Sequence, residues 1–224
     1  MVAIEVLLKS IEGAIFDLDG VIVDTAKYHY FAWKKLANML RFEFTEKDNE
    51  KLKGVSRKES LEILLKIGGK ENEFSEAQKE ELMDIKNNWY LEYVGKLTED
   101  DLLPGAKETI LTLKEQGIKT GLATASKNAM LILERLKIKD LFDAIVDGTQ
   151  ISRAKPDPEI FLKCAQKLKV APQKCIVFED AAAGIKAAKA AGMFAIGVGS
   201  PETLSEADIV VGNLTQLVKK LNWK

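Results

Sequence analysis

The chain has 224 residues, of which 46% are hydrophobic and 30% charged, and its formal net charge is −1. This composition is typical of a folded globular protein and excludes wholesale disorder. The even balance of charge gives no sign of a surface for nucleic acid or for an anionic membrane, so we expect neither partner. Two cysteines, Cys164 and Cys175, and a single histidine are too few for a disulfide framework or a zinc site. We interpret both cysteines as core thiols.

The beginning of the chain gives little evidence of targeting. Glu5 interrupts its only apolar stretch, which disfavours a secretory signal, and no apolar run approaches the ~20 residues of a membrane span. We therefore expect a cytoplasmic protein. Residues 1–12 precede the first predicted strand, and their pattern does not distinguish an edge strand from a tail or a partner surface. A monomer is the expectation, with the oligomeric state left open by this segment.

Short apolar runs alternate with longer amphipathic segments, which is typical of a parallel sheet covered by helices. The predicted strands are Ala14–Leu18, Lys119–Ala123, Cys175–Phe178, Phe194–Val198 and, at an edge, Asp208–Val211. The predicted helices are Ala106–Gln116, Asn128–Leu136, Pro158–Leu168 and Ala181–Ala191. We predict an α/β fold built on a doubly wound parallel sheet.

The segment between the first two strands breaks this alternation. Residues 25–97 show helical periodicity with many Lys and Glu residues and no strand pattern. So long an interval between two strands predicts an inserted helical cap domain at 25–97, and an α/β core domain made of 1–24 and 98–224. Pro104 and Gly105 mark the turn that returns the chain to the core.

Acidic residues follow two of the predicted strands. Asp17 and Asp19 lie two apart at the end of the first strand and so share a face, while Gly20 permits a sharp turn. A second pair, Glu179 and Asp180, follows a later strand. Ligands bind beyond the carboxyl ends of such strands, where four carboxylates repel one another unless a cation lies among them. An Asp-x-Asp-Gly segment alone is equally consistent with a turn or cap, but two acidic pairs at two strand ends favour a Mg²⁺ site.

Donors that suit an anion follow other predicted elements. Thr124 ends a strand and precedes a helix, whose amino end attracts anions. Ser126 has the alternative role of a helix N-cap. Lys155 precedes Pro156 at the start of another helix, where its ammonium could serve a phosphoryl group or Asp17, although a lone Lys-Pro pair is more often at the surface.

Taken in order, Asp17-Leu18-Asp19-Gly20-Val21, Thr124, Lys155-Pro156 and Glu179-Asp180 resemble the four motifs of the haloacid dehalogenase-like phosphotransferases. The resemblance covers the chain from Ala14 to about Gly199. Within that superfamily the chain is similar to the β-phosphoglucomutases. The finer points of likeness are Asp24-Thr25-Ala26-Lys27-Tyr28-His29, Trp33, Leu52-Lys53-Gly54-Val55-Ser56-Arg57, Lys86-Asn87 and Ala125-Ser126-Lys127-Asn128.

The resemblance implies roles for the core residues. Asp17 is expected to be the nucleophile that forms an aspartyl-phosphate, and Asp19 the general acid and base. Mg²⁺ is expected on Asp17, Glu179, Asp180 and the backbone carbonyl of Asp19, with Lys155 neutralising charge. Thr124 is expected to hold a phosphoryl oxygen; the mutases that the chain resembles have Ser at this position, and Thr keeps the hydroxyl.

The resemblance also implies roles for the cap. His29 and Lys86 are expected to position Asp19 when the cap closes, and Arg57 to bind the phosphate that is not being transferred. Thr25, His29 and Trp33 lie on one helical face, where a lone histidine is more often a packing residue; the segment 53–57 reads equally as a charged interhelical turn. The full expected substrate-binding set is His29, Trp33, Leu52, Lys53, Gly54, Val55, Ser56, Arg57, Ser60, Lys86, Ala125, Ser126, Lys127 and Asn128.

The expected reaction is the interconversion of β-glucose 1-phosphate and glucose 6-phosphate through a 1,6-bisphosphate, by an isomerase acting on small sugar phosphates. A Mg²⁺-dependent sugar-phosphate phosphatase of the same superfamily is the alternative, since it shares the first step and differs only in water being the acceptor. A protein that binds Mg²⁺ or a phosphosugar without catalysis would need no acid–base residue such as Asp19, which disfavours that class.

Overall fold

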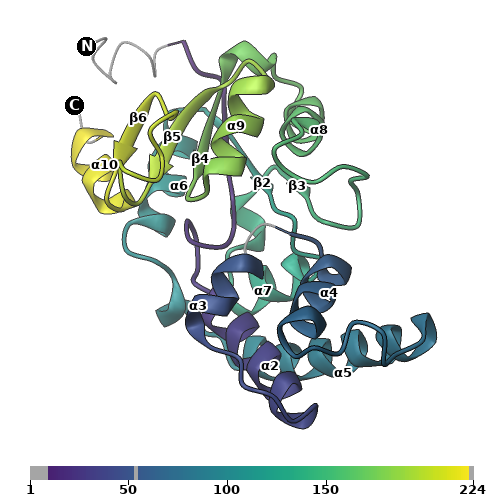
Figure 1. Ribbon diagram of the computed structural model, residues 1–224. Helices are drawn as coiled ribbons and strands as arrows, with labels where there is room; N and C mark the ends of the chain where they lie inside the picture. Colours follow the sequence, from purple (N-terminus) through teal and green to yellow (C-terminus); the bar gives the residue numbers. More distant parts are fainter. Residues whose placement is uncertain (1–9, 53–54, 222–224) are drawn as a thin grey trace. The chain divides into compact units, whose positions relative to one another are not determined.

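The computed structural model describes residues 10–52 and 55–221 (Figure 1). The chain divides into two compact units, one formed by Met1–Asp24 and Thr98–Lys224, and the other by Thr25–Leu97. The predictions made for Lys53, Gly54 and most of the segment 1–12 lie outside the described residues.

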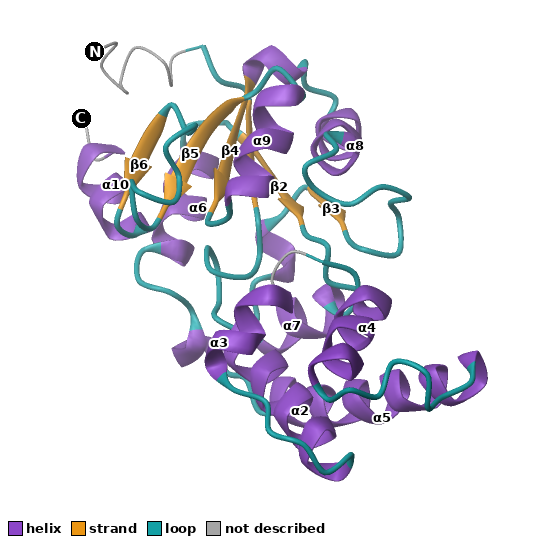
Figure 2. Cartoon of the chain, viewed as in Figure 1, coloured by secondary structure: helices purple, strands orange, loops and turns teal. Residues whose placement is uncertain are grey.

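The first unit is built on a parallel six-stranded sheet (Figure 2). Its strands are β1 Gly13–Phe16, β2 Lys119–Ala123, β3 Ala144–Val146, β4 Cys175–Glu179, β5 Phe194–Val198 and β6 Ile209–Val211. They lie in the order β3-β2-β1-β4-β5-β6, with Ile15 of β1 paired with Gly121 on one side and Val177 on the other. This order reverses between β1 and β4, as in doubly wound folds, and confirms the predicted fold class.

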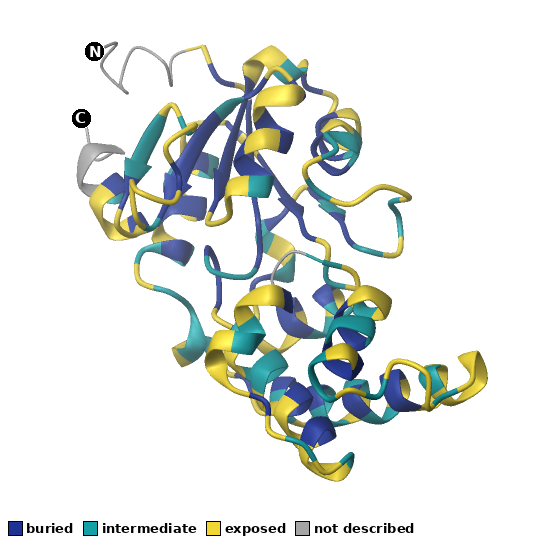
Figure 3. Ribbon diagram, viewed as in Figure 1, coloured by how far each residue is buried: buried dark blue, intermediate teal, exposed yellow. Residues whose placement is uncertain are grey.

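Helices cover both faces of this sheet (Figure 1). The helices of this unit are α6 Ala106–Glu115, α7 Ala129–Arg135, α8 Glu159–Leu168, α9 Ala182–Ala190 and α10 Leu214–Leu221, with short 3-10 turns at Glu99–Asp101, Lys139–Leu141 and Pro172–Lys174. Helices α8 and α9 pack on one face and α6 on the other, where α10 lies against it. The sheet between them is largely buried (Figure 3). Short apolar strands without polar alternation are what a sheet covered on both faces requires.

The two cysteines belong to this buried layer. Both are free thiols, and burial raises the pKa of Cys164 to about 12 and that of Cys175 to about 11. A thiol that does not ionise near neutral pH is a poor nucleophile, so these residues act as small apolar side chains.

The structure differs from the predicted elements in places that matter for the site. Strand β1 ends at Phe16, two residues before the predicted end, because the chain then turns: the Gly20 N–H donates to the Val23 carbonyl (2.8 Å) and the Ile22 N–H to the Leu18 carbonyl (2.9 Å). Asp17 directly follows the strand and its N–H still donates to the Phe178 carbonyl of β4 (2.9 Å), whereas Asp19 lies in the turn, bridged to Val23, and not, as predicted, on the strand. Strand β3 and helix α10 were not predicted; β3 has only three residues, too few for a periodic signal.

The second unit is helical in the residues described. It contains α2 Ala26–Met39, α3 Glu46–Asn49, a 3-10 turn Glu50–Leu52, α4 Arg57–Ile67 and α5 Glu76–Val94. Thr45, Ser56 and Ser75 cap α3, α4 and α5, each accepting a hydrogen bond from the backbone N–H three residues on. Leucines and aromatic residues of α2, α4 and α5 form a separate apolar core. None of the described helices in either unit is long and apolar enough to cross a membrane.

Candidate active site

Charged side chains meet at the carboxyl ends of β1 and β4, the two central strands between which the order of the sheet reverses. The Lys155 ammonium donates to Asp17 Oδ1 (2.5 Å) and to Glu179 Oε2 (2.7 Å). Asp17 is 6% and Glu179 1% exposed. Lys155 comes from the loop before α8, and its peptide bond to Pro156 is cis. Three motifs that are far apart in the sequence are thus joined in one buried ion-pair network.

The network is dominated by negative charge. Burial raises the pKa of Asp17 well above its usual range, with the charges of Glu179 and Asp180 adding to the effect and Lys155 opposing it. Burial also disfavours the ammonium form of Lys155, but the carboxylates of Asp17 and Glu179 outweigh it and raise the pKa of Lys155. Removal of the Asp180 carboxyl group from bulk water, together with the charges of Glu179 and Asp19, raises the pKa of Asp180 to about 7. One ammonium does not neutralise this group of carboxylates.

The carboxylates fit a hard cation. Oxygen atoms of Asp17, Glu179 and Asp180 all lie within 4.8 Å of one another, close enough to share one ion. An all-oxygen set with excess negative charge is the donor chemistry that Mg²⁺ prefers, with water or phosphate completing its shell. An acidic cluster of this composition, in which Asp17 and Glu179 are buried and Asp180 is exposed, matches the use of Mg²⁺ that is general among phosphotransferases of this kind.

Two glycines shape the acidic pair after β4. At Gly20, where φ is +77°, an added Cβ would lie 1.9 Å from Asp180 Oδ2. At Gly184 of α9 it would lie 2.0 Å from Glu179 Cδ. Glu179 Oε1 also accepts from the Ala181 N–H (3.1 Å). Both glycines permit a close approach of backbone to carboxylate that any side chain would block.

The loop after β2 supplies polar groups. Thr124 is buried, its N–H donates to the Val146 carbonyl (3.0 Å) that extends the pairing with β3, and its Oγ1 accepts from the Ser126 N–H (3.1 Å). Ser126 Oγ in turn accepts from the Asn128 N–H (3.3 Å). Asn128, and not Ser126, is the N-cap residue of α7. Ala125 and Lys127 both border Gly148, where an added Cβ would lie 2.1 Å from the Ala125 carbonyl oxygen.

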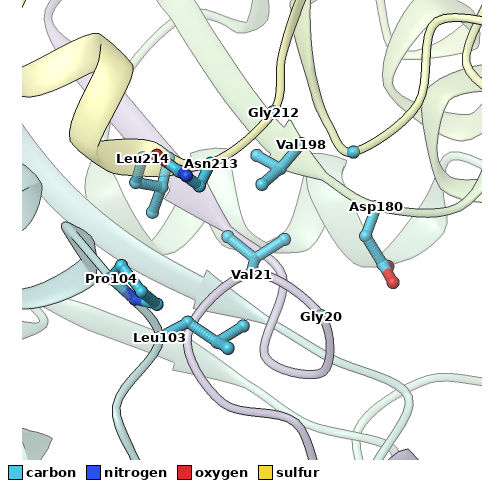
Figure 4. Close-up of a pocket in the computed structure, with 10 residues that line it drawn as sticks. Gly20, Val21, Leu103, Pro104, Asp180, Val198, Gly212, Asn213 and Leu214 are labelled. Atoms are coloured by element: carbon cyan, nitrogen blue, oxygen red, sulfur yellow. The ribbon is translucent and has the colours of Figure 1, made fainter.

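A pocket of about 310 Å³ opens beside this acidic site in the first unit (Figure 4). Apolar side chains line it, and Asp180 stands at its edge near Gly20. The apolar lining residues are Val21, Leu103, Pro104, Val198 and Leu214.

The residues predicted in the helical unit fall into two groups. His29, Trp33 and Lys86 come together between α2 and α5: Lys86 Nζ lies 2.7 Å from His29 Nδ1 and 4.6 Å from the centre of the Trp33 ring. Arg57 lies at the start of α4, where its Nη2 donates to Asn87 Oδ1 of α5 (2.8 Å).

The other described residues predicted in this unit cap a helix or lie in or near the apolar core. Ser56 is the N-cap of α4 and accepts from the Glu59 N–H. Leu52 and Ser60 are buried, and Val55 is partly exposed.

Three residues that were given no role from the sequence contact predicted site residues of their own unit. Gly184 abuts Glu179, Asn87 binds Arg57, and the Tyr90 ring stacks on His29 with 4.0 Å between centroids. Gly184 lies in an alanine- and glycine-rich stretch whose pattern indicated only close packing. The spacing of Lys86 and Tyr90, four residues apart on a helix, was the one available signal for Tyr90.

The site combines a buried aspartate, a lysine that pairs with it, and a second acidic pair. The family model described as haloacid dehalogenase-like hydrolase matches residues 14–198. The chain belongs to the haloacid dehalogenase-like hydrolase family. This confirms the family inferred from the four motifs.

Within this family, the chain is similar to β-phosphoglucomutases and to a phosphatase. The chain is 50% identical to a β-phosphoglucomutase of Bacillus subtilis over 210 residues. This aligned region covers 94% of this chain and 93% of the relative. A crystal structure of β-phosphoglucomutase from Clostridium difficile matches with a TM-score of 0.87 and 46% identity, covering 95% of this chain and 97% of that one. A phosphorylated carbohydrates phosphatase of Thermotoga maritima is 35% identical, over 81% of this chain and 82% of the relative. The likeness to β-phosphoglucomutases is confirmed.

Proposed function

We propose that this chain is a β-phosphoglucomutase, an isomerase that interconverts β-D-glucose 1-phosphate and D-glucose 6-phosphate through an aspartyl-phosphate and β-glucose 1,6-bisphosphate. The observation that carries the proposal is the 50% identity to the Bacillus subtilis β-phosphoglucomutase over nearly the whole of both chains. The site supports it, because Asp17 is paired with Lys155 and Asp19 follows two residues later, in the turn after β1. A cytoplasmic location and a monomeric state stay predictions.

Asp17 is the proposed nucleophile. One of its carboxylate oxygens attacks phosphorus, the bond from phosphorus to the sugar oxygen breaks, and Asp19 gives its proton to the leaving oxygen. When the phosphoryl group comes from C1 of β-glucose 1,6-bisphosphate, the sugar released is glucose 6-phosphate. Asp19, now a carboxylate, then takes the proton of the 6-hydroxyl of β-glucose 1-phosphate, whose oxygen attacks the aspartyl-phosphate, re-forms the bisphosphate and regenerates Asp17. Lys155 holds Asp17 in place and offsets the negative charge that this approach of two anions brings together.

Magnesium is the proposed cofactor. Asp17, Glu179, Asp180 and the carbonyl of Asp19 would hold it, and the ion would withdraw charge from the phosphoryl oxygens during transfer. Thr124 is proposed to bind a phosphoryl oxygen, because its hydroxyl lies in the loop that follows the neighbouring strand β2. Arg57, Lys86 and His29, and Ala125 to Asn128, remain the proposed contacts of the sugar phosphate.

A sugar-phosphate phosphatase is the second candidate, favoured by the relative of that name from Thermotoga maritima. The two activities share the attack by Asp17 and differ in the acceptor, which is water in the phosphatase. The aspartyl-phosphate alone therefore does not distinguish them.

A paired assay separates the two functions. Purified protein is given Mg²⁺, β-glucose 1-phosphate and a trace of glucose 1,6-bisphosphate, and both glucose 6-phosphate and free phosphate are followed. A mutase forms glucose 6-phosphate well in excess of phosphate and leaves the α anomer unchanged. Phosphate in excess would overturn the mutase and support the phosphatase. Asp17→Asn, which keeps the shape of the side chain, should abolish both products and the phosphorylated enzyme seen by intact mass.

A further inference from the structure

Two helices of the second unit enclose the only histidine of the chain. His29 of α2 faces Lys86 and Tyr90 of α5, with Lys86 Nζ 2.7 Å from His29 Nδ1 and the Tyr90 ring stacked on the imidazole at 4.0 Å and 23°. Lys86 is 2% and Tyr90 0% exposed. The imidazole is therefore held at one nitrogen and across one face by side chains that are themselves fixed by burial.

The Lys86 ammonium has aromatic and not carboxylate surroundings. Its Nζ lies 4.6 Å from the centre of the Trp33 ring and 5.1 Å from that of Tyr90, the geometry of cation–π contacts. Among the residues that the structure describes, no carboxylate forms an ion pair with it. Within the part of the chain that the structure describes, His29 Nδ1 and the Trp33 and Tyr90 rings are therefore the contacts that hold Lys86 Nζ.

The chemistry of the pair determines the proton on His29. An ammonium has three donors and no lone pair, so a hydrogen bond between Lys86 and Nδ1 requires Nδ1 to accept. The neutral imidazole then carries its single proton on Nε2. Burial, with the charges of Lys86 and Arg57, lowers the pKa of His29 well below its usual range, so the neutral form is the stable one.

The Tyr90 hydroxyl fixes the ring on which the imidazole rests. It donates to Thr25 Oγ1 (3.2 Å), and Thr25, the N-cap residue of α2, is fully buried. Thr25, His29 and Trp33 follow one another at intervals of one turn along one face of α2. Lys86 and Tyr90 are one turn apart on the facing side of α5, and side chains of the two faces contact one another.

We propose that Tyr90 and Lys86 are positioning residues for His29: the Tyr90 ring fixes the imidazole plane, and the Lys86 ammonium holds the tautomer protonated on Nε2. His29 then offers the reaction an N–H donor and not a lone pair. The use of that donor in phosphoryl transfer rests on the proposed function, whereas the tautomer itself does not.

The single histidine allows a direct test in the full-length protein. With ¹⁵N-labelled histidine, two-bond ¹H–¹⁵N correlations at about pH 6, below the pKa of about 7 to which burial and Arg57 lower Lys86, report which nitrogen carries the proton. The expected pattern is Nε2–H. A proton on Nδ1, an imidazolium, or an average of the two tautomers would overturn the proposal, whether or not the protein is a mutase.

Variants separate positioning from mere stability. Lys86→Met should give averaged tautomers, and Tyr90→Leu should do the same and lower kcat on the order of tenfold, as loss of an outer partner of a functional histidine does, with little change in KM. Tyr90→Phe, which keeps the ring, should restore the wild-type spectrum. Tyr93→Leu is the matched control, because Tyr93 stacks on Tyr28 between the same two helices, whereas the ring stacked on His29 is that of Tyr90. If Tyr93→Leu alters the His29 signals as much as Tyr90→Leu, the role of Tyr90 is only structural and the proposal fails.

Discussion

The carboxyl group of Glu179 lies directly against the backbone of α9 at Gly184, where an added Cβ would stand 2.0 Å from Glu179 Cδ and 2.1 Å from Oε2. A helix therefore forms one wall of the acidic site, and its smallest residue sets the position of a carboxylate that also accepts from Lys155. The contact links the packing of α9 on the sheet to the charge distribution of the site.

Substitution of Gly184 by Ala should displace this carboxylate. We expect the Mg²⁺ concentration for half-maximal activity to rise on the order of tenfold, the usual effect of disturbing a metal site from its surroundings. Helix propensity favours Ala over Gly by up to about 1 kcal/mol, which opposes the cost of the clash, and the melting temperature of the variant shows whether it remains folded. Lys186→Ala, on the exposed side of α9, is the control. An unchanged Mg²⁺ requirement in Gly184→Ala would show that Glu179 moves aside without consequence.

Lys155→Met tests the buried ion-pair network. The substitution leaves Asp17 and Glu179 without their shared donor, and removal of one partner from a buried ionic group destabilises a protein by about 3–5 kcal/mol. The melting temperature in the presence of a chelator should fall, and Mg²⁺ should recover part of the loss because it binds the folded state. Scanning calorimetry with and without Mg²⁺ provides the measurement. Equal melting temperatures for Lys155→Met and the wild type in chelator would contradict the network.

Asn87→Ala tests whether Arg57 needs its neighbour. The Arg57 guanidinium donates to Asn87 Oδ1 (2.8 Å), and loss of one such hydrogen bond to a charged group is worth about 1.5–3 kcal/mol. We expect a higher KM for the sugar phosphate with kcat less affected, because a loosened guanidinium weakens binding. Steady-state kinetics beside Arg57→Ala give the comparison. A double variant no worse than Arg57→Ala alone is expected; additive losses would mean that Asn87 acts elsewhere.

Lys86 should make stability depend on pH. Burial and the charge of Arg57 lower its pKa from 10.5 to about 7 in the folded protein. Between these two values the unfolded chain binds the proton more tightly, so the free energy of unfolding rises with pH through this window. The wild type should therefore gain stability over Lys86→Met between about pH 7 and pH 10.5, measured by urea unfolding. His29 titrates below the window, and its own contribution does not interfere. A difference that stays constant over this range would refute the lowered pKa.

Most strands and helices of the first unit were predicted from the sequence, because hydrophobic periodicity and turn preferences act within a single segment of the chain. Strands β2 and β5 coincide with the predicted Lys119–Ala123 and Phe194–Val198. A short apolar run bounded by turn residues is the pattern of a strand that is buried on both faces of a parallel sheet. The residues at which elements end were harder to predict. The turn after Phe16 depends on hydrogen bonds of Gly20 and Ile22 that no periodicity reports.

The acidic motifs by themselves determined that carboxylates would gather at the strand ends, because the order of a doubly wound sheet brings the carboxyl ends of β1 and β4 side by side. Only the tertiary structure decided how they are held. Lys155 joins Asp17 to Glu179, Gly184 confines Glu179, and Lys86 binds His29 across 57 residues of sequence. Such contacts depend on distances between elements set by packing, and a linear pattern records residue types and spacings but not those distances.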